Sequence, residues 1–176
     1  MNEDRRTKKT KQILRVSLIE LLDVQPLEKI TVSQLVAHAD IARSTFYLHY
    51  TDIFDLYDQL VTSTVAELVT NLQESYPTTQ VYSELLEQLM AEIAANYAIF
   101  HTLVKSNELN FINHIKPIFI KKIMQLDPLS KDPLENKLMS ILAVGGTVDV
   151  LVEWIRKGMT PDAKTVAEII SRYFEM

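Results

Sequence analysis

The amino-acid sequence predicts an all-α protein, and three observations lead to this prediction. The chain of 176 residues holds only three glycines, Gly145, Gly146 and Gly158, whereas sheets with tight hairpins usually need glycine at positive φ. Apolar residues recur along most of the chain at the spacing of amphipathic helices. Cap residues and prolines separate these stretches, so the sequence reads as successive helices joined by short breaks.

The first two predicted helices are bounded by a proline and by a capping box. A helix over 5–24 ends at Gln25-Pro26, because proline disfavours the α conformation of the residue before it. Thr31 then begins a short helix, since its hydroxyl can accept from the amide of Gln34 while the Gln34 side chain reaches back. This second helix is expected to run only to about Ala39.

A tight turn separates the second helix from the third. The predicted turn is Asp40-Ile41, and a third short helix follows over about 42–49. Thr51 is predicted to cap a fourth helix, which continues to about Ser75.

Tyr76-Pro77 interrupts the helical pattern, and we place the domain boundary at this point. Residues 1–75 form the first predicted domain and residues 76–176 the second. The second domain is expected to begin with one long helix over 79–105, followed by helical residues 107–126.

Prolines and caps mark the rest of the second domain. Pro117 must either start a new helix or kink the one that contains it. Asp132-Pro133 is a clear helix start, and that helix is expected to stop at Gly158. Thr160-Pro161 then opens a last helix, to about Phe174.

The basic side chains gather near the N-terminus. The whole chain has a net charge of −5, but residues 1–51 hold eight basic and six acidic side chains. Residues 5–15 hold six basic groups and no acid. This run is either a solvated helix start or an arm that binds phosphates, and phosphate binding would weaken steeply with salt.

Several classes of function find no support in the sequence. The chain has no cysteine, which excludes a disulfide framework, a thiol nucleophile and cysteine-ligated metal. The four histidines lack metal-ligand spacing, and no nucleophile elbow, phosphate loop or dinucleotide turn is present. We therefore expect no catalytic residues, no metal, no cofactor and no enzyme activity.

The sequence also predicts a cytoplasmic protein without a membrane partner. The first fifteen residues are polar and basic, so no signal peptide is visible. The longest apolar stretch, Ile141 to Ile155, carries Asp149 and Glu153 and is judged too short and too charged to span a membrane.

Three short helices followed by a long one, with a tight turn between the second and third, are typical of a helix-turn-helix. The third helix is then expected to enter the major groove of double-stranded DNA. Arg43 can donate to a guanine edge, Ser44 suits either base type, and Leu48 can touch a thymine methyl group. Tyr47 and His49 can donate to phosphates. The residues expected to face the small core are Ile41, Phe46 and Tyr50.

The segment that carries this pattern resembles the TetR family of bacterial transcriptional regulators. Residues 30–60 read ITVSQLVAHADIARSTFYLHYTDIFDLYDQL. The positions that match the family are Thr31, Leu35, Ala39, Thr45, Tyr47, His49 and Leu56. The complete set of predicted DNA-binding residues is Thr31, Ser33, Arg43, Ser44, Thr45, Tyr47, Leu48 and His49.

The same segment departs from the family pattern at the turn, the cap and the fourth helix. Asp40 stands where the family prefers glycine, and Ala42 replaces the usual serine cap. The acids Asp52, Asp55 and Asp58 lie where the family often carries a lysine. A lysine there would reach for phosphate, so these acids are expected to weaken nonspecific DNA binding.

The family resemblance implies a homodimer with two recognition helices about one DNA turn, ~34 Å, apart. Residues 135–175 also resemble the DhaS-like subgroup of the family. The helix over 134–157 is apolar nearly all round, so it needs burial on more than one side, and a second subunit can supply it. The predicted dimer-interface residues are Val144, Val148, Leu151, Ile155, Val166, Ile170, Tyr173 and Phe174.

A set of aromatic and neighbouring side chains in the second domain is a candidate effector pocket. The predicted lining residues are Tyr97, Phe100, His101, Phe111, Met139 and Trp154. The alternative is that these residues are ordinary core, because aromatic stripes at helical spacing usually pack.

The function predicted from the sequence is a homodimeric, sequence-specific transcriptional regulator, with repression and release by a small-molecule effector as the family default. Activation stays open at this point, since both begin with operator binding. The alternative is a co-regulator of the same fold that acts through a protein partner and binds DNA weakly or not at all. The acids at 52, 55 and 58 and the net charge favour that alternative.

Overall fold

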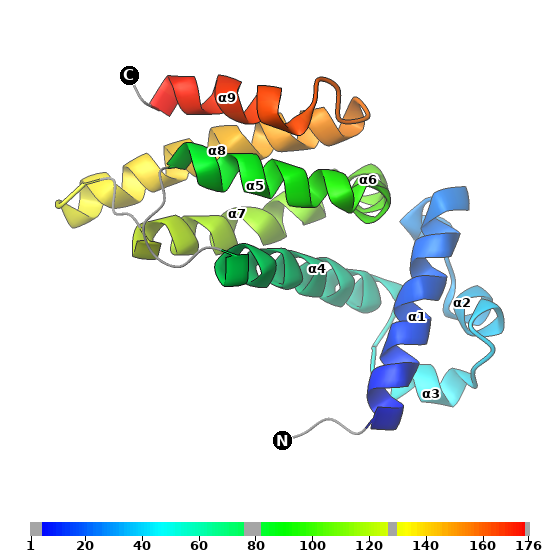
Figure 1. Ribbon diagram of the computed structural model, residues 1–176. Helices are drawn as coiled ribbons and strands as arrows, with labels where there is room; N and C mark the ends of the chain where they lie inside the picture. Colours follow the sequence, from blue (N-terminus) through cyan, green and yellow to red (C-terminus); the bar gives the residue numbers. More distant parts are fainter. Residues whose placement is uncertain (1–4, 76–81, 127–129, 175–176) are drawn as a thin grey trace. The chain divides into compact units, whose positions relative to one another are not determined.

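The structure is a computed structural model that describes residues 5–75, 82–126 and 130–174 (Figure 1). Within these ranges all regular secondary structure is helical, in nine α-helices and one 3₁₀ turn. The prediction of an all-α protein is confirmed.

The chain divides into two compact units, Met1–Val61 and Thr62–Met176. The division falls inside helix α4 (Ile53–Ser75), which therefore contributes residues to both units. The boundary predicted from the sequence, between residues 75 and 76, stays a prediction, because residues 76–81 lie outside the described part of the chain.

The first unit contains the four helices that the sequence predicts at its start. They are α1 (Arg5–Val24), α2 (Val32–His38), α3 (Arg43–Tyr47) and the beginning of α4, with a 3₁₀ turn over Leu27–Lys29 after α1. The core of this unit is built from apolar side chains that recur at helical spacing and are buried. The fully buried members are Leu14, Leu18, Leu27, Leu35, Phe46, Leu56, Tyr57 and Val61.

The start of α4 differs by one residue from the prediction. The cap is Asp52, whose Oδ1 accepts from the Asp55 amide at 2.9 Å, and not Thr51. Thr51 instead donates its backbone amide to the Asp55 carboxylate at 2.8 Å. The predicted cap was wrong because a carboxylate one position later reaches the same free amides, which every helix start exposes.

The second unit holds the remaining part of α4 and five further helices. These are α5 (Tyr82–Ala95), α6 (Tyr97–Ser106), α7 (Glu108–Leu126), α8 (Pro133–Arg156) and α9 (Ala163–Phe174). In Figure 1, α9 lies along α5, and α8 lies along α7 and α6.

The single long helix predicted over 79–105 is wrong, because the described part of it is broken at Asn96. Asn96 leaves the helical conformation at φ −112° and ψ 31°. Its side-chain Nδ2 donates to the Glu92 carbonyl at 2.9 Å, and its amide also turns to Glu92. Asparagine competes with the backbone for such bonds and so favours helix ends.

The sequence left open whether Pro117 starts a helix or kinks one. Pro117 lies inside α7, so it does not start a new helix.

Asp132 caps α8 as predicted, with its Oδ1 accepting from the Glu135 amide at 2.8 Å. The last helix begins at Ala163, two residues after the predicted start, because Asp162 accepts from the Thr165 amide.

By length and composition alone, the whole of helix α8 is long and apolar enough to cross a membrane. The apolar stretch considered from the sequence, Ile141 to Ile155, is only part of this helix and was judged too short and too charged. Half of the most apolar 18-residue window of α8 is buried inside the protein. The core helix of a soluble protein passes the same test, so the apolar character of α8 carries little evidence for a membrane span.

Replacing Asp132 with alanine is expected to destabilise the second unit by about 1 kcal/mol, because the Glu135 amide loses its acceptor. For a chain of this size the melting temperature should fall by roughly 2–4 °C. Asp132→Ser, which retains a capping oxygen, is the matched control and should melt close to the parent. Equal melting temperatures for the alanine and serine variants would contradict the role of the cap.

Candidate nucleic-acid interface

Helix α2 begins with the capping box that the sequence predicts. The Thr31 hydroxyl accepts from the Gln34 amide at 3.2 Å, and the Gln34 side chain accepts from the Thr31 amide at 2.9 Å. Two free amides at the helix start are thereby satisfied. The start of α2, and with it the position of Ser33, is fixed by local chemistry.

The tight turn after α2 is a Schellman motif with aspartate in the place of glycine. The Ile41 amide donates to the Val36 carbonyl at 3.0 Å, and the Asp40 amide donates to the Ala37 carbonyl at 3.4 Å. Asp40 takes the left-handed conformation, at φ 51°. Aspartate reaches this conformation more readily than most residues, so the turn forms without the glycine that the family prefers.

Aromatic side chains anchor the short helix α3 to the first unit. Phe46 and Tyr50 are buried, and their rings lie 5.7 Å apart. Tyr47 packs edge-to-face against Phe46 at 5.3 Å. Ala42 makes no side-chain cap, so α3 depends on this packing rather than on its own start. The helix is held firmly on one side and presents the other side to solvent.

Three predicted DNA-binding residues form one polar cluster across α2 and α3. The Arg43 guanidinium donates to the Ser33 hydroxyl at 3.2 Å and to the Tyr47 hydroxyl at 3.1 Å. It also lies 5.6 Å from the centre of the Tyr47 ring. The link between Arg43 and Tyr47 is readable from their spacing of four residues, whereas the contact with Ser33 depends on the turn and escaped the sequence analysis.

The other predicted DNA-binding residues differ in how far their side chains are exposed to solvent. Leu48 is 78% exposed, and Ser44 is also exposed. Thr45 and His49 are half-buried, with the His49 ring edge-on to Tyr50 at 6.4 Å. Thr31 is exposed, but its hydroxyl already takes part in the capping box.

Two of the three acids after α3 have structural tasks at the start of α4. The Asp55 carboxylate accepts from the Thr51 amide and from the Gln59 side chain, each at 2.8 Å. The Thr51 amide, and then Gln59, hold the pKa of Asp55 below its usual value. Asp52 is the cap described above. The sequence pattern Asp-x-x-Asp indicates this capping role, because it places one carboxylate at the helix cap and a second three residues later, where it can accept from the backbone near the cap.

The basic run at the start of the chain lies on α1. Arg5, Lys8 and Lys9 have exposed side chains, and their spacing places them along the first turns of the helix. Flexible cations of this kind can follow a phosphate backbone.

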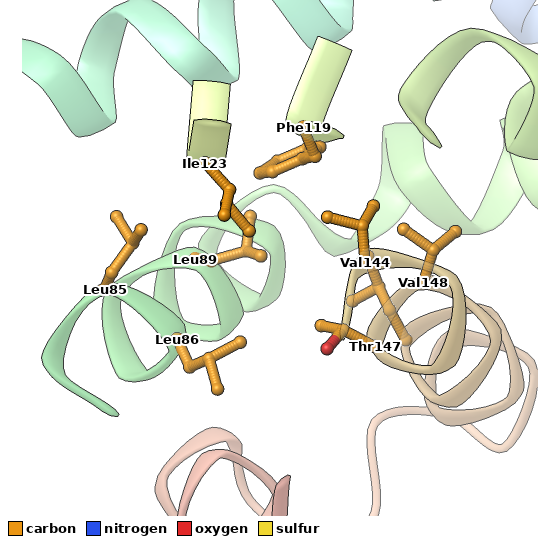
Figure 2. Close-up of a pocket in the computed structure, with 9 residues that line it drawn as sticks. Leu85, Leu86, Leu89, Phe119, Ile123, Val144, Thr147 and Val148 are labelled. Carbon is orange, nitrogen blue, oxygen red and sulfur yellow. The ribbon is translucent and has the colours of Figure 1, made fainter. Parts of the chain in front are cut away.

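The second unit contains an apolar hollow of about 30 Å³ between α5, α7 and α8 (Figure 2). Thr147 is the one polar residue of the lining, which is otherwise aliphatic apart from Phe119. The lining residues are Leu85, Leu86, Leu89, Phe119, Ile123, Val144, Thr147, Val148 and Leu151.

None of the six residues predicted to bind an effector lines this hollow. Phe100 and Phe111 pack edge-to-face at 6.2 Å in the core, and Met139 is exposed. The buried Trp154 donates its indole N–H to the Pro161 carbonyl at 2.6 Å.

Tyr97 and His101 lie together, with their rings 5.1 Å apart. His101 also borders a separate open groove of about 420 Å³, together with Val104, Lys105, Ser106, Asn107, Glu108 and Arg156.

The predicted dimer-interface residues lie mostly on the inner side of their helices. Six of the eight predicted interface residues are buried within the single chain: Val144, Val148, Leu151, Ile155, Val166 and Ile170. A partner could reach these six only if the chain repacked. Tyr173 is 74% exposed, and the Phe174 side chain lies outside the described part. The exposed apolar residues of α8 and α9 are Leu134, Leu138, Met139, Ile141, Leu142, Val150, Ile169 and Tyr173.

Comparison with known proteins finds a matching family model for the sequence and similar solved structures for the fold. A family model described as "Transcriptional regulator C-terminal region" (TetR_C_8) matches residues 80–176. No curated protein sequence matches the chain.

Among solved structures, the chain resembles the TetR transcriptional regulator from Streptococcus agalactiae 2603V. The TM-score is 0.71 at 19% identity, over 97% of this chain and 96% of that one. It also resembles the dihydroxyacetone kinase operon activator DhaS, with a TM-score of 0.61 at 17% identity over 93% of each chain. The regulator FadR from Bacillus subtilis, solved in complex with stearoyl-CoA, gives 0.60 at 16% identity over 92% of this chain and 95% of that one. These similarities show a shared fold.

The lowered pKa of Asp55 predicts a component of acid sensitivity. A carboxyl whose folded-state pKa is depressed stabilises the fold above its unfolded pKa of about 3.9 and loses that contribution as the pH falls through the folded value. Between pH 5 and 3 the melting temperature of Asp55→Asn should therefore fall less than that of the parent. Glu168→Gln, at an exposed acid of α9, serves as the control and should follow the parent. Parallel curves for the parent and Asp55→Asn would contradict this assignment.

Proposed function

Because the chain belongs to the TetR family of transcriptional regulators, we propose that it binds operator DNA as a homodimer and inserts α3 into the major groove. The observation that carries the proposal is the cluster of Arg43, Ser33 and Tyr47 on an exposed face whose opposite side is anchored by Phe46 and Tyr50. A guanidinium held by two hydroxyls is oriented before it meets a base, which lowers the entropy lost on binding.

The proposed roles follow from the chemistry of each side chain. Arg43 donates to the acceptors of a guanine edge, and Leu48 contacts a thymine methyl group. Tyr47 and His49 donate to phosphates and fix the register of the helix on the duplex. Arg5, Lys8 and Lys9 on α1 add sequence-independent attraction, so binding is expected to weaken strongly with salt.

The alternative, a co-regulator that acts through a protein partner with little DNA binding, loses part of its support. It was favoured by the acids after α3, but Asp52 and Asp55 are engaged in the start of α4. Their presence is accounted for by helix capping, so they do not by themselves indicate that DNA affinity has been lost.

A second copy of this chain is the proposed partner of the exposed stripe on α8. Leu134, Leu138, Ile141 and Leu142 follow one another at helical spacing, and all are exposed. Gly145 continues the stripe, and no atom lies within 4 Å of the position where a Cβ would stand. A partner helix can therefore approach closely at this point. The inner side of α8 is already covered by the chain itself, which leaves this outer side for the partner.

The proposed regulatory step is release of the operator by a small-molecule effector in the cytoplasm. An effector acts only through different affinities for the DNA-binding and the non-binding conformation. The sign of regulation follows the family default, repression. The structural neighbour DhaS is named an activator, so a reporter assay is needed to measure the sign for this chain.

Selection of genomic DNA fragments by the full chain is expected to enrich a palindromic sequence. Tyr47→Ala should abolish the enrichment. Arg43→Ala should weaken binding to the selected operator by about 5- to 150-fold, since a bidentate contact to guanine contributes roughly 1–3 kcal/mol. Arg172→Ala, at an exposed arginine of α9, is the matched control and should bind normally.

Two outcomes would contradict this proposal. One is the absence of an enriched motif, with a protein partner that co-purifies with the chain, which would favour the co-regulator. The other is equal operator affinity for Arg43→Ala and Arg172→Ala.

A charge on the exposed stripe of α8 is expected to disrupt the dimer. Leu142→Glu places a carboxylate at a position that is 67% exposed in the single chain, so the subunit should still fold. Sedimentation velocity at micromolar concentration should show a dimer for the parent and a monomer for this variant. Leu109→Glu, at an exposed leucine of α7, is the matched control and should remain dimeric. A parent chain that sediments as a monomer would reject the dimer itself.

A further inference from the structure

Arg43 is the single lysine or arginine between residues 30 and 104, a stretch that contains both α2 and α3. These two helices therefore owe their permanent positive charge to one guanidinium. The basic run on α1 attracts phosphates whatever the sequence of the DNA, so it contributes affinity rather than base recognition. Recognition of guanine by a permanently charged side chain of α2 or α3 thus falls to Arg43.

Two side chains hold this guanidinium, and they come from different helices. Its Nη1 donates to the Ser33 hydroxyl on α2 at 3.2 Å, and its Nη2 donates to the Tyr47 hydroxyl on α3 at 3.1 Å. Tyr47 by itself fixes Arg43 relative to its own helix, whereas Ser33 ties Arg43 to the neighbouring helix. The guanidinium is therefore oriented relative to both helices at once.

The two hydrogen bonds leave the guanidinium able to read a base. A guanidinium has five N–H donors in a rigid plane, two of them on each terminal nitrogen. Ser33 and Tyr47 take up one donor on each terminal nitrogen, so a second donor on each remains. Two remaining donors are enough for a bidentate contact with O6 and N7 of guanine. Ser33 can therefore hold Arg43 while Arg43 contacts DNA.

We propose that Ser33 is a positioning residue: it sets the base specificity of this protein by holding Arg43, and its hydroxyl does not itself read the operator. The inference rests on the proposed function, since it concerns the operator contact of Arg43. Without the Ser33 hydroxyl, the Arg43 side chain keeps more rotamers in the free protein, and this freedom is lost on binding. Ordering one rotamer-rich side chain at an interface lowers an affinity by about 2- to 13-fold.

The test uses the operator selected by the full chain and a second duplex that differs at one base pair. That pair is the guanine pair whose preference disappears in Arg43→Ala, and it is replaced by A·T in both half-sites. Binding of the full chain to each duplex is measured by fluorescence anisotropy at one fixed salt concentration. Ser33→Ala should weaken binding to the selected operator by about 2- to 13-fold and leave binding to the substituted duplex unchanged. Ser33→Thr retains a hydroxyl and should restore the preference for guanine.

A double-mutant cycle separates positioning from direct contact. Adding Ser33→Ala to Arg43→Ala should not weaken operator binding further, because no guanidinium is left to position. A Ser33 hydroxyl that contacted a phosphate or a base would instead cause the same loss in both backgrounds. Thr70→Ala, at an exposed hydroxyl of α4 that donates to the Ala66 carbonyl of its own helix, is the control and should bind both duplexes like the parent.

Four results would overturn the inference while the operator binding of the parent stands. They are an unchanged operator affinity in Ser33→Ala, an equal loss on both duplexes, the same loss in the Arg43→Ala background, and an operator in which no guanine preference depends on Arg43. A parent chain that enriches no operator rejects the proposed function and this inference with it. The two failures are therefore distinguished by the binding of the parent.

Discussion

The need to cover an apolar helix on more than one side organises the second unit. Helix α8 packs against α7 and α6, and its inner stripe, which includes Val144, Val148 and Leu151, is buried by the chain itself. Its outer stripe, which includes Leu138 and Leu142, remains exposed. Exposed apolar patches on this scale usually mark interaction surfaces, and this exposed stripe is the surface that we propose a second copy of the chain covers. In the proposed dimer, the chain itself would bury the inner side of α8 and the second copy would bury its outer side.

A local constraint of a different kind governs the first unit. The orientation of α3 depends on a turn of two residues, and that turn depends on the left-handed conformation of Asp40. With the turn in this conformation, Phe46 and Tyr50 lie in the core, and the guanidinium of Arg43 contacts Ser33 on the preceding helix. The polar cluster proposed to contact DNA is therefore a consequence of backbone geometry, and it does not depend on a strong helix start, which Ala42 does not supply.

Local chemistry was readable from the sequence, and tertiary packing was not. The caps at Thr31 and Asp132 were predicted correctly because their partners lie three residues away. The break at Asn96 was missed because the apolar stripe continues across it, and the departure from helical geometry is confined to Asn96, whose side chain bonds to the Glu92 carbonyl. The two sides of α8 could not be told apart because both are apolar. The hollow was missed because its walls come from three helices between residues 85 and 151, which only the fold brings together.

Helix α8 contributes both to the wall of the apolar hollow and to the exposed apolar stripe. Val144 and Val148 line the hollow on one side of α8, while Leu138 and Leu142 stand exposed on another. In the proposed dimer, α8 would link the packing of its inner side to the subunit interface on its outer side. A change of packing on the inner side would then be thermodynamically linked to association on the outer side, and such linkage is reciprocal. The proposed regulator would thus connect the interior of its second unit to its subunit interface through a single helix.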